Sequence, residues 1–203
     1  MERASIPLTE LQMPTFGAWE PGWFSLTAGE NRPGAFNSMT VSWGALGVIW
    51  HRPLAVVVVR PQRYTREFME RYDTFSLCAF DESYRPALNL LGTQSGRDTR
   101  KMTECGLTPI ALTTIPCPGY AEAELILECR KMYFDDLEPA HFLADFIAPN
   151  YQNDYHRMYF GEVVAAAGTA RFRCPGGKRE TKRREAKGRK PKGKNPSRRK
   201  ARR

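Results

Sequence analysis

Two arginines at the end of an apolar run could together hold an anion. Residues 54–59 are uniformly apolar, and Arg60 and Arg63 follow them directly, just before Thr65. Thr65 is expected to cap a short helix, whose first N–H groups have no partner inside the helix. Guanidinium groups and free helix N–H groups both bind phosphate. The spacing therefore indicates a phosphate site, or else a surface on which both arginines pair with nearby acidic residues, Glu67, Glu70 or Asp73.

A second polar cluster begins at Ser95 and Gly96 and includes Arg97 and Lys101. A hydroxyl, a glycine that permits close backbone approach and a cation suit a turn that cradles an anion. Lys101 is one of only two lysines among residues 1–175, which contain 14 arginines. A compact ammonium at this position would serve a phosphate as a point charge, or it is an ordinary solvated side chain.

A third group lies on an expected strand edge and offers an amide, two hydroxyls and backbone N–H groups. Its members are Asn37, Ser38, Met39 and Thr40. These donors and acceptors match the pyrimidine edge of an isoalloxazine ring.

Aromatic side chains near these residues could cover a flat ligand. Trp43 and Trp50 could lie against a ring or simply pack in the core, and the polar motif before Trp43 favours Trp43 as a pocket wall. His156 begins an expected strand, where it would face a site or hydrogen-bond a loop. No Cys/His or Ser/His/Asp arrangement follows from the spacing, so a hydrolase is not indicated.

The surrounding pattern predicts a mainly β fold, a closed or split barrel covered by a few short helices. Strands are expected at Met39–Trp50, bent at its glycines, at Leu54–Val59 as a buried strand, and at Phe75–Phe80, Ala123–Phe134 and Arg157–Ala166. Helices are expected at Thr65–Arg71, Arg85–Leu91 and Ala140–Ile147. No G-x-G-x-x-G follows a strand, which disfavours a Rossmann domain.

The charge is divided unevenly along the chain of 203 residues, whose net charge is +9. Residues 176–203 hold 15 Lys and Arg against 2 Glu, whereas residues 1–175 carry a net charge of −4. A segment without aromatic or β-branched aliphatic residues cannot bury enough surface to fold. We therefore expect a domain over residues 1–172 and a disordered basic tail over 173–203. The tail could bind nucleic acid or another polyanion, or serve only as a solubilising extension.

Cysteine usage and hydropathy indicate a cytoplasmic protein. Five cysteines without a C-x-x-C pair argue against a disulfide framework and a zinc site. The amino terminus lacks the apolar region of a signal peptide, and His51, Arg52 and Pro53 interrupt the longest apolar run, so no membrane segment is expected.

Taken in order, these motifs resemble the flavin reductase-like family of FMN-binding split barrels, the flavoredoxin branch in particular. The resemblance covers about residues 20–166. It rests on Asn-x-Met-Thr with the following Ser-Trp, Arg-Pro-x-Arg-Tyr-Thr, Ser-Gly-Arg-Asp with its lysine, and His-x-x-Tyr-x-Gly-Glu-Val. It implies that Asn37, Met39 and Trp43 lie near the flavin ring, Thr65 and Lys101 near its phosphate, and His156 beside the cofactor.

The resemblance also implies a homodimer with noncovalently bound FMN. The expected function is that of an oxidoreductase, a flavin reductase or a flavoredoxin-like electron carrier. It would move electrons from NAD(P)H or a reduced protein partner through FMN to an acceptor. The alternative is a polyanion-binding or nucleic-acid-binding protein that acts through its basic tail, with the barrel as a structural module.

Overall fold

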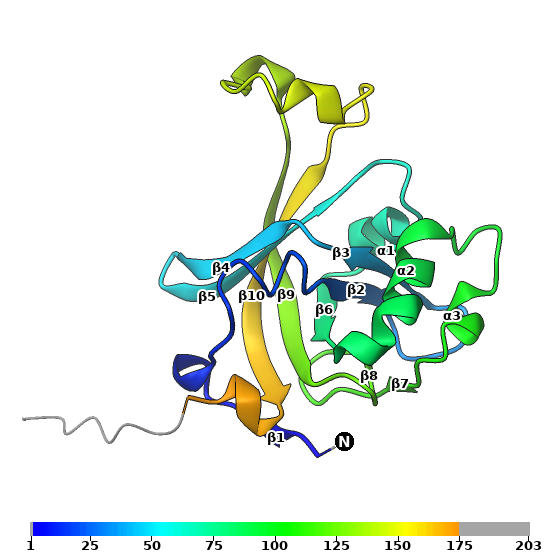
Figure 1. Ribbon diagram of the computed structural model, residues 1–203, viewed down its shortest axis with the longest axis vertical. Helices are drawn as coiled ribbons and strands as arrows, with labels where there is room; N and C mark the ends of the chain where they lie inside the picture. The colour runs from blue at the N-terminus through cyan, green and yellow to red at the C-terminus, as the bar shows by residue number, and fades with distance from the viewer. Residues whose placement is uncertain (1, 175–203) are drawn as a thin grey trace, which may run out of the picture.

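Antiparallel strands are the main regular structure of the protein, and they form from apolar runs and from segments of alternating apolar and polar residues. The computed structural model describes residues 2–174, and its main sheet has the strand order β3-β2-β6-β9-β10-β5-β4, with β1 pairing to β10. The sheet curls into a split barrel (Figure 1). Its strands are β1 (Ala4–Ser5), β2 (Phe24–Gly29), β3 (Phe36–Val41), β4 (Gly44–Ile49), β5 (Arg52–Val59), β6 (Thr74–Ala79), β9 (Leu125–Asp136) and β10 (Arg157–Gly168).

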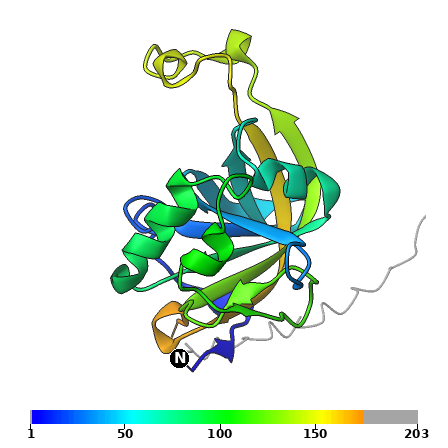
Figure 2. The same ribbon diagram turned by 90° about the vertical axis from the view of Figure 1, so that its right-hand side faces the viewer.

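Short helices cover one side of the sheet (Figure 2). They are α1 (Thr65–Arg71), α2 (Arg85–Thr93) and α3 (Lys101–Glu104), and a small hairpin of β7 (Pro109–Ile110) and β8 (Gly119–Tyr120) accompanies them. Single 3-10 turns lie at η1 (Leu8–Glu10), η2 (Glu82–Tyr84), η3 (Pro139–His141), η4 (Ala148–Asn150) and η5 (Ala170–Phe172).

Two apolar clusters hold these layers together. One fills the barrel and includes Phe24, Leu26, Val57 and Phe75. The other lies between the sheet and α2 and contains Leu88, Leu91, Tyr120 and Ile126, among others. Burying one such side chain stabilises the fold by about 1.5–3 kcal/mol. The two clusters therefore hold β3 and α2 in fixed positions relative to each other.

The two longest strands, β9 and β10, extend beyond the barrel. Register shifts between Phe160 and Gly161 and between Val163 and Ala165 bend the pair. Residues 137–156, which we call the arm, connect their far ends and project away from the barrel (Figures 1 and 2). The arm contains η3 and η4.

The mainly β class is confirmed, and several expected elements are present with small boundary shifts. Helices at Thr65–Arg71 and from Arg85 are observed, as are strands near the last three predicted positions. The sequence pattern missed β2, although its Phe-Ser-Leu-Thr-Ala alternation has the two-residue period of a strand.

Two predicted elements are wrong. Met39–Trp50 is not one bent strand, because the chain leaves β3 at Ser42 and Trp43 and continues as β4 at the opposite edge of the sheet. Ala140–Ile147 is not a helix. Its apolar residues have no layer to pack against, since Leu143 is 97% and Phe146 is 77% exposed, and an isolated short helix is marginal in water.

The buried strand at Leu54–Val59 is present as β5, but it is buried on one face only. Ala55, Val57 and Val59 are buried in the barrel, whereas the alternate residues are partly exposed on the outer face. An uninterrupted apolar run therefore marks two apolar faces, one of which lies outside the barrel.

The first two residues of the predicted tail, Arg173 and Cys174, are described and are bonded to the folded domain. Cys174 still donates its N–H to the Glu10 carbonyl at 2.8 Å, and residues 175–203 lie outside the described residues. Among residues 2–174, no helix combines the length and the apolar character needed to span a membrane.

Candidate functional site

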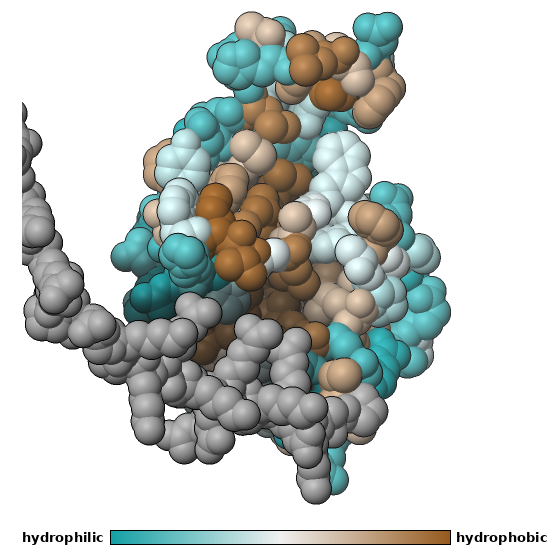
Figure 3. Space-filling view, turned by 90° about the vertical axis from the view of Figure 1, so that its left-hand side faces the viewer, coloured by the Kyte–Doolittle hydropathy of each residue, from teal (hydrophilic) through white to brown (hydrophobic). Residues whose placement is uncertain are grey.

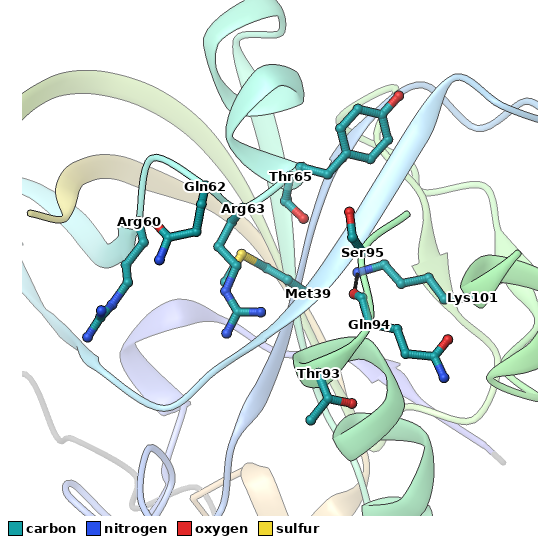
Figure 4. Close-up of a pocket in the computed structure, with 10 residues that line it drawn as sticks. Met39, Arg60, Gln62, Arg63, Thr65, Thr93, Gln94, Ser95 and Lys101 are labelled. Atoms are coloured by element: carbon teal, nitrogen blue, oxygen red, sulfur yellow. Dashed lines mark hydrogen bonds between the residues drawn. The ribbon is translucent and has the colours of Figure 1, made fainter. Parts of the chain in front are cut away.

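Two adjoining cavities form a groove at one end of the barrel. The larger lobe has a volume of about 470 Å³ and the smaller lobe about 150 Å³, and both are lined by Met39, Arg60 and Arg63. Strand β3, the turn between β5 and α1, and the segment after α2 supply the walls. The larger lobe is lined in addition by Gln62, Tyr64, Thr65, Thr93, Gln94, Ser95 and Lys101 (Figure 4).

Lys101 is a buried cation in the larger lobe. Its side chain is held by two carbonyls at the end of α2, since Nζ donates to Leu91 O at 3.1 Å and to Gln94 O at 2.9 Å. The residue is only 3% exposed, and it forms no ion pair with a carboxylate of the described chain. Burial, followed by the neighbouring Arg63, lowers the pKa of Lys101 to about 8.

Arg63 reaches the larger lobe from the other side. Figure 4 shows Arg63 and Lys101 on opposite sides of Met39. One guanidinium nitrogen of Arg63 donates to Gly92 O at 2.5 Å. Burial first, and Arg60 second, lower its pKa below the ordinary value. Within residues 2–174 no carboxylate pairs with Arg63, so the lobe holds two cations that repel each other and would be stabilised by an anion.

Arg60 lines both lobes and is also paired with an acidic residue other than the three that the sequence suggested. Nη1 donates to Asp154 Oδ2 at 2.6 Å and Nη2 to Asn150 O at 2.8 Å. Its guanidinium also lies 5.2 Å from the centre of the Tyr151 ring. Arg60 therefore attaches the arm to the end of β5, and its charge is paired with Asp154 and not with an acidic residue of α1.

Asn37, Thr65 and Gly96 hold the walls of the larger lobe together. Asn37 Nδ2 donates to Thr65 Oγ1 at 2.7 Å. Thr65 is therefore not the helix cap, and the N-cap position is Tyr64, without a side-chain bond. A Cβ at Gly96 would lie 2.3 Å from Asn37 Oδ1, so glycine allows the loop to approach β3 closely.

Ser95 lines the larger lobe, whereas Arg97 turns away from it. Ser95 Oγ accepts from the Arg97 N–H at 3.2 Å. The Arg97 side chain instead pairs with Glu67, donating from Nε at 3.1 Å, and covers the Tyr64 ring. Of the residues predicted to surround an anion, Ser95 therefore lines the groove and the exposed Arg97 does not.

The four residues expected on one strand edge divide between its two faces, because successive strand residues point in opposite directions. Met39 lines both lobes. Ser38 faces the helical layer, where it is fully buried and bonds Thr27 Oγ1 at 2.6 Å and Tyr120 OH at 2.5 Å. Thr40 donates to Leu88 O of α2 and also borders the smaller lobe. The side chain of Ser38 is therefore not available to a ligand in the groove.

Trp43 and His156 form one wall of the smaller lobe. Their ring centres lie 5.3 Å apart, and Trp43 is 42% exposed while His156 is buried. His156 Nδ1 lies 3.0 Å from the hydroxyl of Tyr151. Burial, then Arg60, lowers the pKa of His156 to about 4. Trp50 lies elsewhere, beside Tyr133 at the β4–β5 turn.

Sequence reasoning missed several lining residues. Gln62 lies between Arg60 and Arg63 in the sequence, and Tyr64 lies between Arg63 and Thr65. Thr93 and Gln94 immediately precede Ser95. Their positions beside predicted residues were the available signal. Val41, Ser42 and Val58 line the smaller lobe. The residue types of the two valines do not distinguish them from core residues, whereas Ser42 belongs to the Ser-Trp motif of the family resemblance.

Comparisons with known proteins identify the family and the fold. The family described as flavin reductase like domain matches residues 22–172. Comparison with curated proteins gave no match. The chain belongs to the flavin reductase-like family, and the family match supports a flavin-related oxidoreductase role.

Three solved structures share the fold. An FMN-binding domain of a flavin reductases-like enzyme from Shewanella baltica has a TM-score of 0.59 at 21% identity, covering 82% of this chain and 77% of that one. The 2-nitrobenzoate 2-nitroreductase of Pseudomonas fluorescens has a TM-score of 0.57 at 21% identity, with coverages of 76% and 68%. Flavoredoxin of Desulfovibrio vulgaris has a TM-score of 0.57 at 18% identity, with coverages of 79% and 73%.

Proposed function

We propose that the protein binds FMN noncovalently in the groove and acts as an oxidoreductase. The observation that carries this proposal is the pair of cations in the larger lobe. Lys101 and Arg63 converge there without a carboxylate partner in the described chain. An anion with close to two negative charges, as in a phosphate monoester, matches that pair.

The remaining lining fits a flavin nucleotide. Ser95 and Thr65 add hydroxyl groups to the larger lobe, where the phosphate would be held. Met39, Trp43 and His156 offer an apolar and aromatic surface with one ring nitrogen, which suits the isoalloxazine. Bound FMN would supply a ring that accepts and donates electrons. The chain itself would bind the phosphate, orient the ring and shield one face of it from water.

The electron donor we propose is NAD(P)H or a reduced protein partner. Hydride transfer to a flavin depends on stacking geometry more than on a protein acid or base. That requirement agrees with a groove whose described lining contains no carboxylate. Two neighbours of the same fold are a nitroreductase and a flavoredoxin, so the acceptor could be a small molecule or another protein.

Purification gives the first test of this function. The protein should be yellow, or it should quench the fluorescence of added FMN. Anaerobic addition of NADH or NADPH should then bleach the flavin absorbance if a nicotinamide is the donor. A protein that is colourless and leaves FMN fluorescence unchanged would reject the proposal.

We also propose that the protein is a homodimer that associates through the outer face of the barrel. Ala45, Val56, Phe160 and Tyr133 lie side by side across β4, β5, β10 and β9, and we call them the apolar row. Figure 3 shows apolar side chains gathered on the face of the molecule where β4 and β5 lie. A monomer that leaves such a face in water would be prone to associate.

Light scattering on the purified chain tests the dimer. Val56→Glu places a charge in the apolar row and should convert the dimer to a monomer. Phe16→Glu is the matched control, because Phe16 is an exposed aromatic outside the sheet. A wild-type monomer that binds FMN tightly would contradict the proposed dimer.

We place the protein in the cytoplasm, which agrees with its five free thiols.

A further inference from the structure

Tyr151 connects the arm to the smaller lobe of the groove. Its hydroxyl lies 3.0 Å from His156 Nδ1, and the two rings meet edge to face at 82° with centres 5.5 Å apart. His156 is the residue that lines the groove, while Tyr151 lies behind it in the arm. No other hydrogen bond is made by the hydroxyl of Tyr151 or by the imidazole of His156 within residues 2–174.

Burial first, and the charge of Arg60 second, keep the imidazole of His156 neutral by lowering its pKa. Arg60 and Arg63 lie near His156 and disfavour a further positive charge, Asp154 partly offsets them, and Trp43 is uncharged. A neutral imidazole carries its proton on one nitrogen only, and the partner of the other nitrogen decides which.

The position of Arg60 favours Tyr151 as the donor in this bond. The guanidinium lies 5.2 Å from the centre of the Tyr151 ring and is fixed there by Asp154 at 2.6 Å. Burial raises the pKa of Tyr151 and the charge of Arg60 partly opposes that rise, so the hydroxyl keeps its proton and can donate it to the unprotonated nitrogen of a neutral imidazole. If Tyr151 donates to Nδ1, the proton of His156 must reside on Nε2, on the side of the ring away from Tyr151.

We propose that Tyr151 is a positioning residue that fixes His156 in the Nε2–H tautomer, so that the imidazole donates a hydrogen bond to a ligand ring in the smaller lobe. The acceptor is a carbonyl oxygen or ring nitrogen of a planar heterocycle. This inference rests on the proposed function for the identity of that ring as a flavin. The tautomer itself is a property of the protein without ligand.

Nitrogen-15 NMR of the full chain tests the tautomer directly, since the protein has only three histidines. The signals of His156 are those absent from His156→Gln. In the wild type Nδ1 should show the shift of an unprotonated nitrogen and Nε2 that of an N–H, with no change between pH 8 and 5.5. Tyr151→Phe should give averaged shifts of the two tautomers. Tyr155→Phe should match the wild type, because the Tyr155 ring packs against Tyr151 in a tilted arrangement and its hydroxyl makes no hydrogen bond to His156.

Flavin titration supplies the second measurement. Tyr151→Phe should weaken FMN and riboflavin alike by about threefold to tenfold, the loss expected for one neutral hydrogen bond, while Tyr155→Phe leaves both unchanged. A wild-type protein with its proton on Nδ1, or a Tyr151→Phe variant with unchanged tautomer and affinities, would overturn the proposal. If no flavin binds, the proposed function fails, and the NMR result still decides the role of Tyr151.

Discussion

Lys101 joins a helix end to the groove through a single ammonium group. Nζ donates to two carbonyls at the end of α2, and the same group borders the larger lobe. Substitutions at Lys101 therefore remove a structural contact as well as a positive charge. For this reason Arg63 provides the cleaner test of the phosphate site, and methionine, which preserves most of the side-chain volume, is the better replacement for Lys101.

Arg63→Ala and Lys101→Met should each weaken FMN by about tenfold or more and leave riboflavin nearly unchanged. Each charge-assisted bond to phosphate contributes about 1.5–3 kcal/mol, and 1.4 kcal/mol corresponds to tenfold in affinity. Fluorescence titration with both flavins gives the ratio of the FMN affinity to the riboflavin affinity.

Two further variants serve as controls for this ratio. Arg97→Ala removes a cation that pairs with Glu67 outside the groove and should not change either affinity. Trp43→Ala should weaken both flavins equally, because its contact would be with the ring. An unchanged FMN-to-riboflavin ratio in Arg63→Ala and Lys101→Met would show that this cluster does not bind phosphate.

The affinity for FMN should decrease above pH 8. The pKa of Lys101 is lowered to about 8 by burial and Arg63, so the free protein loses this proton as the pH rises past that value. Phosphate binds the protonated form of Lys101, and FMN affinity should therefore fall by at most about tenfold per pH unit. Titrations from pH 7 to 9.5 should show this slope for FMN, none for riboflavin, and none for FMN with Lys101→Met.

Unfolding does not account for this loss of affinity. A lysine pKa that is lower in the folded than in the unfolded chain means that the unfolded chain binds more protons between the two values. The contribution of Lys101 to the free energy of unfolding therefore increases from pH 8 toward about 10.4. A decrease in apoprotein stability with the same pH profile as the affinity would contradict the assignment to Lys101.

At the scale of elements, the hairpin of β4 and β5 has an unusual turn. Trp50 and His51 form a two-residue connection, and both have positive φ, 49° and 60°. This geometry is that of a type I′ turn, which favours Asn-Gly. A residue other than glycine in the left-handed region costs about 1 kcal/mol or more.

His51→Gly should therefore raise the free energy of unfolding by about 0.5–1 kcal/mol, because glycine adopts positive φ without a steric penalty. Urea denaturation measures the change. Val48→Gly provides the comparison, since Val48 is an exposed residue inside β4 and glycine should destabilise a strand there. If His51→Gly is also destabilising, the prediction is wrong. The side chain of His51 then makes a contact worth more than the backbone strain that glycine removes.

At the scale of the whole molecule, the two parts of the chain carry opposite charges. Residues 1–175 have a net charge of −4 and residues 176–203 a net charge of +13. The second candidate function, binding of nucleic acid or another polyanion, rests on this segment, which lies outside the described residues.

Deletion of residues 176–203 should abolish retention of RNA or DNA and leave FMN binding unchanged, because the groove lies within the remaining chain. Retention by the full chain should weaken steeply as salt rises, as counterion release requires. Filter binding at several salt concentrations measures it. Absence of retention by the full chain at low salt would remove this function.

Local features of the protein could be predicted from the residue pattern. Apolar runs and β-branched or aromatic content predicted β5, β6, β9 and β10, and a sheet could be expected because such residues need a common core. Residue chemistry marked Arg60, Arg63 and Ser95 as candidates for binding an anion, and the family resemblance implied that Thr65 and Lys101 lie near the same phosphate.

The tertiary structure alone decided which of these side chains meet. Arg60 pairs with Asp154, 94 residues away, because β5 and β10 are neighbours in the sheet, and no local pattern specifies that pairing. Ser38 and Met39 face opposite sides, and only the strand's place between the groove and α2 shows which side is the site. The arm lacks the predicted helix because Leu143 and Phe146 have no apolar layer to pack against. Contacts between distant segments depend on strand order and layer packing, which single-sequence periodicity does not contain.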